Sequence, residues 1–397
     1  MDNISSGLSN KLIGLVKAKA DETEYFALLK RYHSMYGDNR KLWEKLFWLF
    51  IDFSGLVNQN RIFDIIISKY SPIDVKKVTE KFLASYDVEQ YNIGFHDNKV
   101  ELNLEISTVC NLACGFCTYS SVINLGKRKA MLMSVADAKA HLIKARLFLL
   151  AAHIPSFRVV FSPTGLGEPL LNPQWSEITD YVGTVFPFTG IKLHTNGLVL
   201  QNEGVLKKIA QSNINALVIS LRFFDSTIYY MNTGSNQGQQ VHANAEKLVK
   251  LLSNQEKNIY LQYFDIEENN LSEIYDYWSK VSTDLGRKVL IMKQEKLEFV
   301  NPEPMALNVA KCPCLQPWNV LTISVTGEWY PCCLALWDDL TSMAIGKKEH
   351  NLSDITNRFI KMRENQLNGK YHQCYGCPGL HEHENENREF NDILRKL

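Results

Sequence analysis

Residues 100–117 read VELNLEISTVCNLACGFC, in which an alternating segment runs straight into three cysteines. The strict alternation of apolar and polar residues over 100–106 predicts a β-strand with one buried face. Cys110, Cys114 and Cys117 follow where this strand should end. The segment therefore predicts a strand that delivers three thiols to one end of a sheet.

Short apolar segments recur after these cysteines, separated by helix-like segments. They span residues 157–162, 190–194, 216–221, 258–264 and 288–293. One intervening helix is expected over residues 134–152, where Ser134 and Asp137 form a capping-box arrangement. The alternation predicts an α/β fold, in which a parallel sheet curls into a partial (β/α)6 TIM-like barrel. Its active loops should lie at the carboxyl ends of the strands.

Two further regions flank this barrel, which we expect over residues 97–300. Residues 1–96 carry apolar side chains at helical spacing and predict a helical N-terminal domain. Residues 321–328 resemble a β-hairpin. A small C-terminal α+β domain is therefore expected over residues 301–397.

Charge and hydropathy exclude several classes of partner. The chain has 43 Lys and Arg against 43 Asp and Glu, so it has no general attraction to nucleic acid or anionic membranes. No apolar run approaches the roughly 20 residues that span a bilayer. The start, MDNI, lacks the features of a signal peptide. We expect a cytoplasmic protein without nucleic-acid or membrane partners, in which disulfides are not favoured.

All nine cysteines lie in two groups, one at residues 110–117 and one at residues 312–377. Buried structural cysteines would scatter along the chain instead of clustering. Three thiolates leave one iron of a four-iron cluster without a protein ligand. A closed zinc site, the alternative, needs a fourth Cys or His nearby, and none follows closely after Cys117.

The spacing of Cys110, Cys114 and Cys117, with Phe116 before the third cysteine, resembles the signature of radical S-adenosylmethionine enzymes. The resemblance implies that these cysteines hold a [4Fe–4S] cluster, whose open iron is chelated by S-adenosylmethionine. It also implies cleavage of this cofactor to a 5′-deoxyadenosyl radical and hydrogen-atom abstraction from a C–H bond. An external electron donor such as flavodoxin or ferredoxin would supply electrons to this cluster.

The same resemblance implies cofactor contacts at the ends of later strands. Gly167-Glu168-Pro169 matches the family's loop that holds the amino group of the cofactor, with Glu168 as its ligand. Asn196 and Ser220 match positions that contact the ribose or the carboxylate. Many relatives carry an arginine further along, but residues 229–234 read YYMNTG here. Arg222 is the substitute that we expect to face the cofactor carboxylate.

The C-terminal cysteines resemble the ligands of SPASM and twitch extensions, which bind auxiliary clusters. One auxiliary [4Fe–4S] cluster is expected, because no cysteine follows residue 377 to serve a second. Its expected ligands are Cys314, Cys332, Cys374 and Cys377. Cys312 and Cys333 are close competitors, since spacing cannot rank neighbouring thiols. A zinc site is the alternative.

The sequence leaves the substrate and the reaction open. SPASM-type members commonly act on peptides, so the first hypothesis is an enzyme that modifies a ribosomally made peptide by epimerisation, oxidation, cross-linking or cleavage. The second is an enzyme of natural-product biosynthesis that acts on a sugar or aminocyclitol. The third is a non-catalytic metal-binding interaction protein. An epimerase would need a hydrogen-atom donor, and Cys312 or Cys333 is the expected one.

Overall fold

The computed structural model describes residues 100–294, 314–336 and 343–368, without residues 120, 121, 124, 125, 153, 155 and 188 but with Trp48. The chain divides into two compact units, Met1–Ser85 with Thr184–Pro187 and Tyr86–Gly183 with Phe188–Leu397. Apart from Trp48, the predicted helical domain lies outside the described residues, as does the predicted boundary at residue 300.

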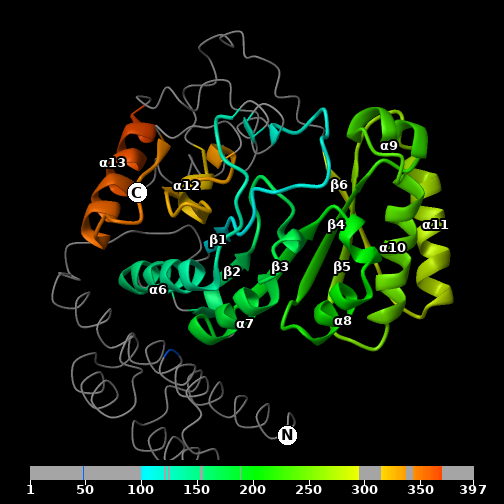
Figure 1. Ribbon diagram of the computed structural model, residues 1–397, viewed down its shortest axis with the longest axis horizontal. Helices are drawn as coiled ribbons and strands as arrows, with labels where there is room; N and C mark the ends of the chain where they lie inside the picture. Colours follow the sequence, from blue (N-terminus) through cyan, green and yellow to red (C-terminus); the bar gives the residue numbers. More distant parts are fainter. Residues whose placement is uncertain are drawn as a thin grey trace, which may run out of the picture. The chain divides into compact units, whose positions relative to one another are not determined.

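The described strands form one eight-stranded sheet in the order β6-β5-β4-β3-β2-β1-β7-β8 (Figure 1). They are β1 (Val100–Leu104), β2 (Val159–Ser162), β3 (Gly190–Thr195), β4 (Ala216–Arg222), β5 (Asn258–Phe264), β6 (Leu290–Gln294), β7 (Val320–Ile323) and β8 (Trp329–Tyr330). Neighbouring strands from β6 to β7 pair in parallel, whereas β7 and β8 pair antiparallel. Because β1 to β6 follow one another in both sequence and space, the predicted partial barrel is confirmed.

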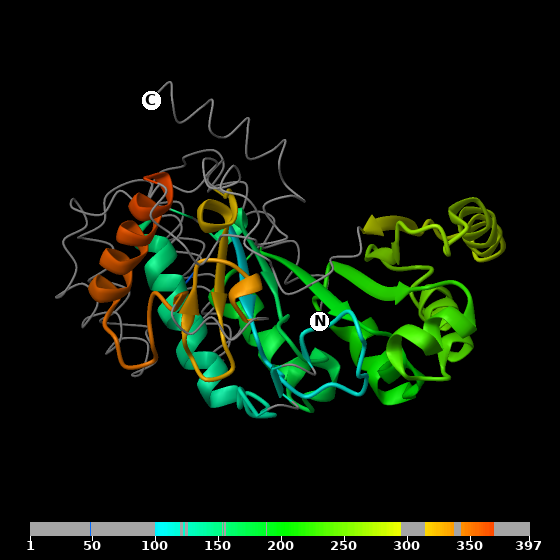
Figure 2. The same cartoon turned by 90° about the horizontal axis from the view of Figure 1, so that it is seen from above.

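Helices join the successive strands of the barrel. They are α6 (Val135–Ala151), α7 (Trp175–Val185), α8 (Glu203–Gln211), α9 (Ser226–Thr233), α10 (Gly238–Leu251) and α11 (Leu271–Asp284). Right-handed crossovers between parallel strands place such helices on one side of the sheet, as Figure 2 shows. The capping box predicted for α6 is confirmed, because the Ser134 hydroxyl accepts from the Asp137 amide at 3.1 Å.

The two faces of the sheet differ in polarity. Alternate side chains point to opposite faces of a strand, and the face toward the helices is apolar. It contains Leu102, Phe161, Leu193, Leu217 and Leu261, each fully buried. The inner face carries polar pairs instead, such as Lys192 with Glu101 at 3.1 Å and Ser220 with Gln262 at 3.1 Å. Polar chemistry is therefore directed to the inside of the partial barrel.

The C-terminal part adds to the same sheet. β7 and β8 form the predicted hairpin, and Leu102 of β1 pairs with Leu321 of β7. Helix α13 (Leu352–Leu367) and β8 both pack on α6, where the Phe148 ring lies 5.4 Å from that of Trp329 and 5.9 Å from that of Phe359. Among the described helices, none is long and apolar enough to cross a membrane.

Candidate active site

Three thiols lie in the loop that follows β1. Cys110, Cys114 and Cys117 are all half-buried. Burial raises the pKa of Cys110 to about 11 and that of Cys114 to about 12, and the charges of neighbouring thiols raise both further. Burial also raises the pKa of Cys117. Desolvated thiols this close together ionise only beside a compensating positive centre, so this donor set fits a metal cluster. In the described part of the chain, no group of three His, Cys, Asp or Glu residues is placed to hold a single metal ion.

The cysteine loop is anchored through its own backbone. The Tyr119 amide donates to the Cys117 sulfur at 3.4 Å, and the Tyr119 hydroxyl accepts from the Cys110 amide at 3.3 Å. The Gly115 amide donates to the Asn232 carbonyl, in α9, at 2.8 Å. The loop is thus tied to itself and to the helix that follows β4.

Phe116 is the apolar anchor of the same loop. Its ring packs edge-on against Phe264 at 4.9 Å and lies 6.0 Å from Phe223. Both partners lie at the ends of the neighbouring strands β4 and β5. Aromatic pairs of this kind contribute about 0.5–1.5 kcal/mol beyond burial. Phe116 therefore packs the cysteine loop against the carboxyl end of the barrel through ring contacts with Phe223 and Phe264.

The loop after β2 lies directly against the residues that lead to Cys110. The Gly167 amide donates to the Ser107 carbonyl at 3.2 Å, and the Glu168 amide donates to the Val109 carbonyl at 2.8 Å. A Cβ on Gly167 would lie 2.6 Å from the Val109 oxygen and 2.7 Å from the Ser107 oxygen. Only glycine permits this approach of two backbones.

Gly167→Ala should therefore separate the loop after β2 from the cysteine loop. We expect S-adenosylmethionine affinity to fall at least about tenfold, because a shift of this loop misplaces a charged hydrogen-bond partner. Gly190→Ala is the matched control, since a Cβ there meets no atom within 4 Å. Titration calorimetry on both variants measures the effect, and equal affinities would contradict this account of the loop.

Glu168 is buried at the start of the 3-10 helix η5 (Pro169–Leu171), with 3% of its surface exposed. Its carboxylate accepts from the Thr195 hydroxyl at 2.8 Å, the Asn196 amide at 2.7 Å and the Leu170 amide at 3.2 Å. Burial raises the pKa of Glu168 to about 7, although these hydrogen bonds favour the ionised form. The carboxylate is held in one orientation at the end of β3.

Asn196 connects that carboxylate to the cysteine loop. Its side-chain amide donates to the Asn111 side chain at 2.7 Å and lies 3.9 Å from the Cys110 sulfur. Because the Asn196 backbone also donates to Glu168, the ends of β1, β2 and β3 meet at this residue. The predicted residues Cys110, Glu168 and Asn196 are therefore brought together.

Arg222, at the end of β4, lies near the cysteine loop. Its φ of 67° is left-handed, and the ladder with β5 shifts register between Ser220 and Arg222. Such a conformation costs about 1–3 kcal/mol and is found mostly at functional sites. The guanidinium lies 4.9 Å from the centre of the Phe264 ring, and its charge opposes the raised pKa values of Cys114 and Cys117. Ser220 instead donates to Gln262 at 3.1 Å.

Part of the predicted auxiliary site is described. Cys314 is buried, whereas Cys332 and Cys333 are half-buried. Cys332 packs against a small core formed by Tyr330, Ala335, Leu336 and Met343. Cys312, Cys374 and Cys377 lie outside the described residues. The choice among neighbouring thiols therefore stays a prediction.

Arg363 anchors the segment that follows Cys314. Its guanidinium donates to the Pro317 carbonyl at 2.8 and 3.0 Å, and lies 4.4 Å from the Trp318 ring centre. Burial lowers the pKa of Arg363 to about 9. This contact ties helix α12 (Gln316–Asn319) to α13.

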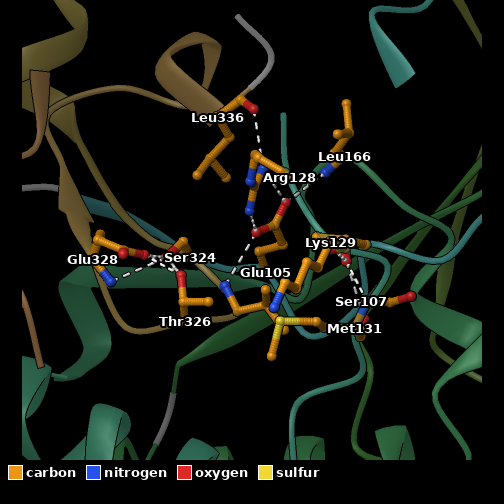
Figure 3. A network of polar contacts seen from close by, with 12 residues as sticks. Glu105, Ser107, Arg128, Lys129, Met131, Leu166, Ser324, Thr326, Glu328 and Leu336 are labelled. Carbon is orange, nitrogen blue, oxygen red and sulfur yellow. Dashed lines mark hydrogen bonds and ion pairs between the residues drawn. The ribbon is translucent and has the colours of Figure 1, made fainter. Parts of the chain in front are cut away.

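The sequence did not reveal the ion pair of Glu105 and Arg128, which lies at the base of the cysteine loop (Figure 3). Glu105 is fully buried, just beyond β1. The sequence did contain one signal, because Glu105 is a polar residue of the alternating segment and a buried charge requires a partner. Nothing in the spacing identified Arg128 as that partner.

Known proteins resemble the chain over parts of its length. Residues 312–378 match SPASM, an iron-sulfur cluster-binding domain. GTP 3′,8-cyclase of Vibrio atlanticus is 24% identical over 211 residues, which cover 53% of this chain and 59% of the cyclase. Mycofactocin maturase MftC of Mycolicibacterium smegmatis is 31% identical over 134 residues, which cover 34% of this chain and 30% of the maturase. The chain thus spans less than two thirds of either relative.

A solved structure, that of Streptococcus suis SuiB bound to precursor peptide SuiA, is 15% identical. The match covers 79% of this chain and 81% of SuiB, with a TM-score of 0.44. The SPASM match spans the C-terminal cysteine group, from Cys312 to Cys377. The chain therefore resembles radical S-adenosylmethionine enzymes, and its residues 312–378 match the SPASM iron-sulfur cluster-binding domain.

Proposed function

We propose that this enzyme abstracts a hydrogen atom from a C–H bond of a ribosomally made peptide. The observation that carries the chemistry is the meeting of three cysteines, Glu168, Asn196 and Arg222 at the carboxyl ends of β1 to β4. The SPASM match supports a peptide as the substrate, because enzymes with this extension commonly act on peptides. The sugar or aminocyclitol hypothesis remains the alternative that the experiment below tests.

The proposed roles follow from where each side chain lies. Cys110, Cys114 and Cys117 would hold the [4Fe–4S] cluster, and Glu168 would accept hydrogen bonds from the cofactor ammonium. Arg222 would face the cofactor carboxylate, because its charge reaches Cys114 and Cys117. When bound, the cluster and S-adenosylmethionine together supply the radical chemistry.

The remaining groups would hold the cofactor in place and serve the second cluster. Asn196 and Ser220 would contact the ribose or the carboxylate of S-adenosylmethionine. Cys314, Cys332, Cys374 and Cys377 would hold one auxiliary [4Fe–4S] cluster. An external donor such as flavodoxin or ferredoxin would provide electrons, and we place the enzyme in the cytoplasm.

Product analysis tests this function directly. The anaerobically reconstituted protein is incubated with S-adenosylmethionine, dithionite and either candidate peptides or candidate sugars, and 5′-deoxyadenosine is quantified by mass spectrometry. We expect a peptide to stimulate its formation, and deuterium from a labelled peptide to appear in it. Stimulation by sugars alone would support the second hypothesis. Failure to form 5′-deoxyadenosine under any condition would contradict radical chemistry.

The same assay tests a thiol donor for the substrate radical. If the reaction is an epimerisation, turnover in deuterated water should place deuterium on the abstracted carbon. We expect either Cys312→Ala or Cys333→Ala to lose this product while the iron content is kept. Cys332→Ala is the control, because that variant should lose iron. Full product formation by both donor variants would favour an oxidative or lyase outcome.

A further inference from the structure

The base of the cysteine loop contains an ion pair between Glu105 and Arg128. The Glu105 carboxylate is fully buried, and 14% of the Arg128 side chain is exposed. The contact is a fork, in which Nη1 donates to Oε1 at 3.1 Å and Nη2 contacts Oε2. Forked arginine–carboxylate pairs fix geometry more strictly than single contacts. This pair can therefore hold two segments in one arrangement.

The pair joins the two sides of the cysteine loop. Glu105 precedes the cysteines and Arg128 follows them (Figure 3). Thr108 makes the next contacts between the two segments. Its hydroxyl donates to the Lys129 carbonyl at 2.8 Å and accepts from the Met131 amide at 2.7 Å. These contacts hold the two ends of the cysteine loop together at its base.

The Glu105 carboxylate also binds two segments that are distant in sequence. Oε1 accepts from the Leu166 amide at 3.0 Å, in the loop that carries Glu168. Oε2 accepts from the Val325 amide at 3.1 Å, just beyond β7. Gly165 fits tightly here, because a Cβ on it would lie 2.3 Å from the Glu105 Cγ. One carboxylate thus contacts the cofactor loop and the C-terminal part.

Arg128 extends the connection toward the auxiliary cysteines. Its Nη1 also donates to the Leu336 carbonyl at 3.1 Å. Leu336 ends the 3-10 helix η8 (Leu334–Leu336), and its amide donates to the Cys333 carbonyl at 3.1 Å. Only one short turn therefore separates the guanidinium from the segment of Cys332 and Cys333.

Burying this pair is costly unless its hydrogen bonds are satisfied, and apolar residues often stabilise a fold equally well. Here both carboxylate oxygens accept from arginine and from a backbone amide. A pair that contacts three further segments, at Leu166, Val325 and Leu336, suits a role in placing these segments better than a role in overall stability.

We propose that Glu105 and Arg128 are positioning residues that set the place of the auxiliary-cluster segment relative to the first cluster and the cofactor loop. This inference rests on the proposed function, because it assumes that both clusters are present. Glu105 joins the first cluster loop to the loop of Glu168, and Arg128 adds the segment of Cys332 and Cys333. Neither residue touches the reacting atoms.

Two conservative variants separate these contacts. Arg128→Lys keeps a cation beside Glu105 but replaces the two guanidinium nitrogens by one ammonium, which cannot keep both the forked contact and the hydrogen bond to Leu336. Glu105→Gln keeps one oxygen as an acceptor but presents an amide N–H₂ where either Leu166 or Val325 now donates. Lys247→Ala is the control, because it removes an ion pair with Glu203 in which both side chains are exposed.

Electron paramagnetic resonance of the doubly reduced protein provides the decisive readout. Two nearby paramagnetic clusters speed each other's spin relaxation, and this effect depends steeply on their separation. We expect Arg128→Lys to retain about eight irons and full S-adenosylmethionine affinity but to alter the mutual relaxation. Glu105→Gln should also weaken S-adenosylmethionine binding by about tenfold. Relaxation unchanged in both variants, at full iron content, would overturn the proposal.

Hydrogen exchange in the unloaded protein separates this inference from the proposed function. If wild type fails to bind two clusters or to cleave S-adenosylmethionine, the proposed function fails, yet the placement can still be measured. Arg128→Lys should then raise exchange in residues 332–336, and Glu105→Gln should raise it at whichever of the Leu166 and Val325 amides loses its acceptor. Lys247→Ala should leave both segments unchanged. Exchange equal to wild type in both pair variants would exclude a positioning role.

Discussion

Replacing Cys110, Cys114 and Cys117 together by alanine should reduce the iron content of the reconstituted protein from about eight atoms to about four. The reason is that these thiols would hold one four-iron cluster, whereas the separate C-terminal cysteine group would hold the auxiliary cluster. Formation of 5′-deoxyadenosine should stop completely, since S-adenosylmethionine loses the iron that it chelates. Iron analysis and the product assay measure the two effects on the same sample.

Cys332→Ala serves as the reciprocal variant, because it should lose the auxiliary iron and retain the first cluster. Two results would contradict the two-cluster assignment. One is full iron content in the triple alanine variant, and the other is zinc in place of iron in the wild type.

Glu168→Ala should weaken S-adenosylmethionine binding by about 10- to 100-fold while leaving the iron content unchanged. Its carboxylate would accept charge-assisted hydrogen bonds from the cofactor ammonium, and alanine removes both the charge and the acceptor. Glu168→Gln keeps the shape and tests the charge alone. Calorimetric titration with S-adenosylmethionine measures both variants. Wild-type affinity in the alanine variant would remove Glu168 from the cofactor site.

The raised pKa of Glu168 adds a pH dependence to this prediction. Burial moves the pKa from 4.5 to about 7, so the folded protein binds this proton more tightly than the unfolded chain does. The carboxyl therefore lowers the free energy of unfolding, by about 3 kcal/mol in total, as the pH rises from about 4.5 to about 7. Urea unfolding of the protein without bound cofactor, repeated at several pH values in this range, measures the effect. The free energy of unfolding of Glu168→Gln should not show this decrease. Cofactor affinity should instead increase through about pH 7, because the ionised carboxylate attracts the ammonium.

Local sequence patterns were sufficient to predict the barrel strands. The alternation before Cys110 predicted β1, and the apolar segment at residues 258–264 coincides with β5. The segment predicted from residue 157 begins as a strand only at Val159, because residues 156–158 form a short 3-10 helix. Such patterns succeed because they reflect burial of one strand face, which is a local property.

Contacts across the chain could not be predicted in this way. Glu105 and Arg128 are ordinary charged residues in the sequence, and their pairing depends on how the cysteine loop returns to β1. The left-handed conformation of Arg222 likewise depends on a register shift against β5. Resemblance to known enzymes predicted which residues would serve the cofactor, but not how the ends of the strands bring them together.

The pairing of β1 with β7 has a consequence for synthesis of the chain. Among the described strands, β1 pairs with β2 on one side, and β7 can cover its other side only after residues 320–323 have left the ribosome. Open edges are sites of aggregation, and closing a loop of this length is slow. The strand that presents the first cysteines is therefore among the last to be covered, so the nascent barrel passes through a stage in which these thiols are already synthesised beside an unfinished sheet.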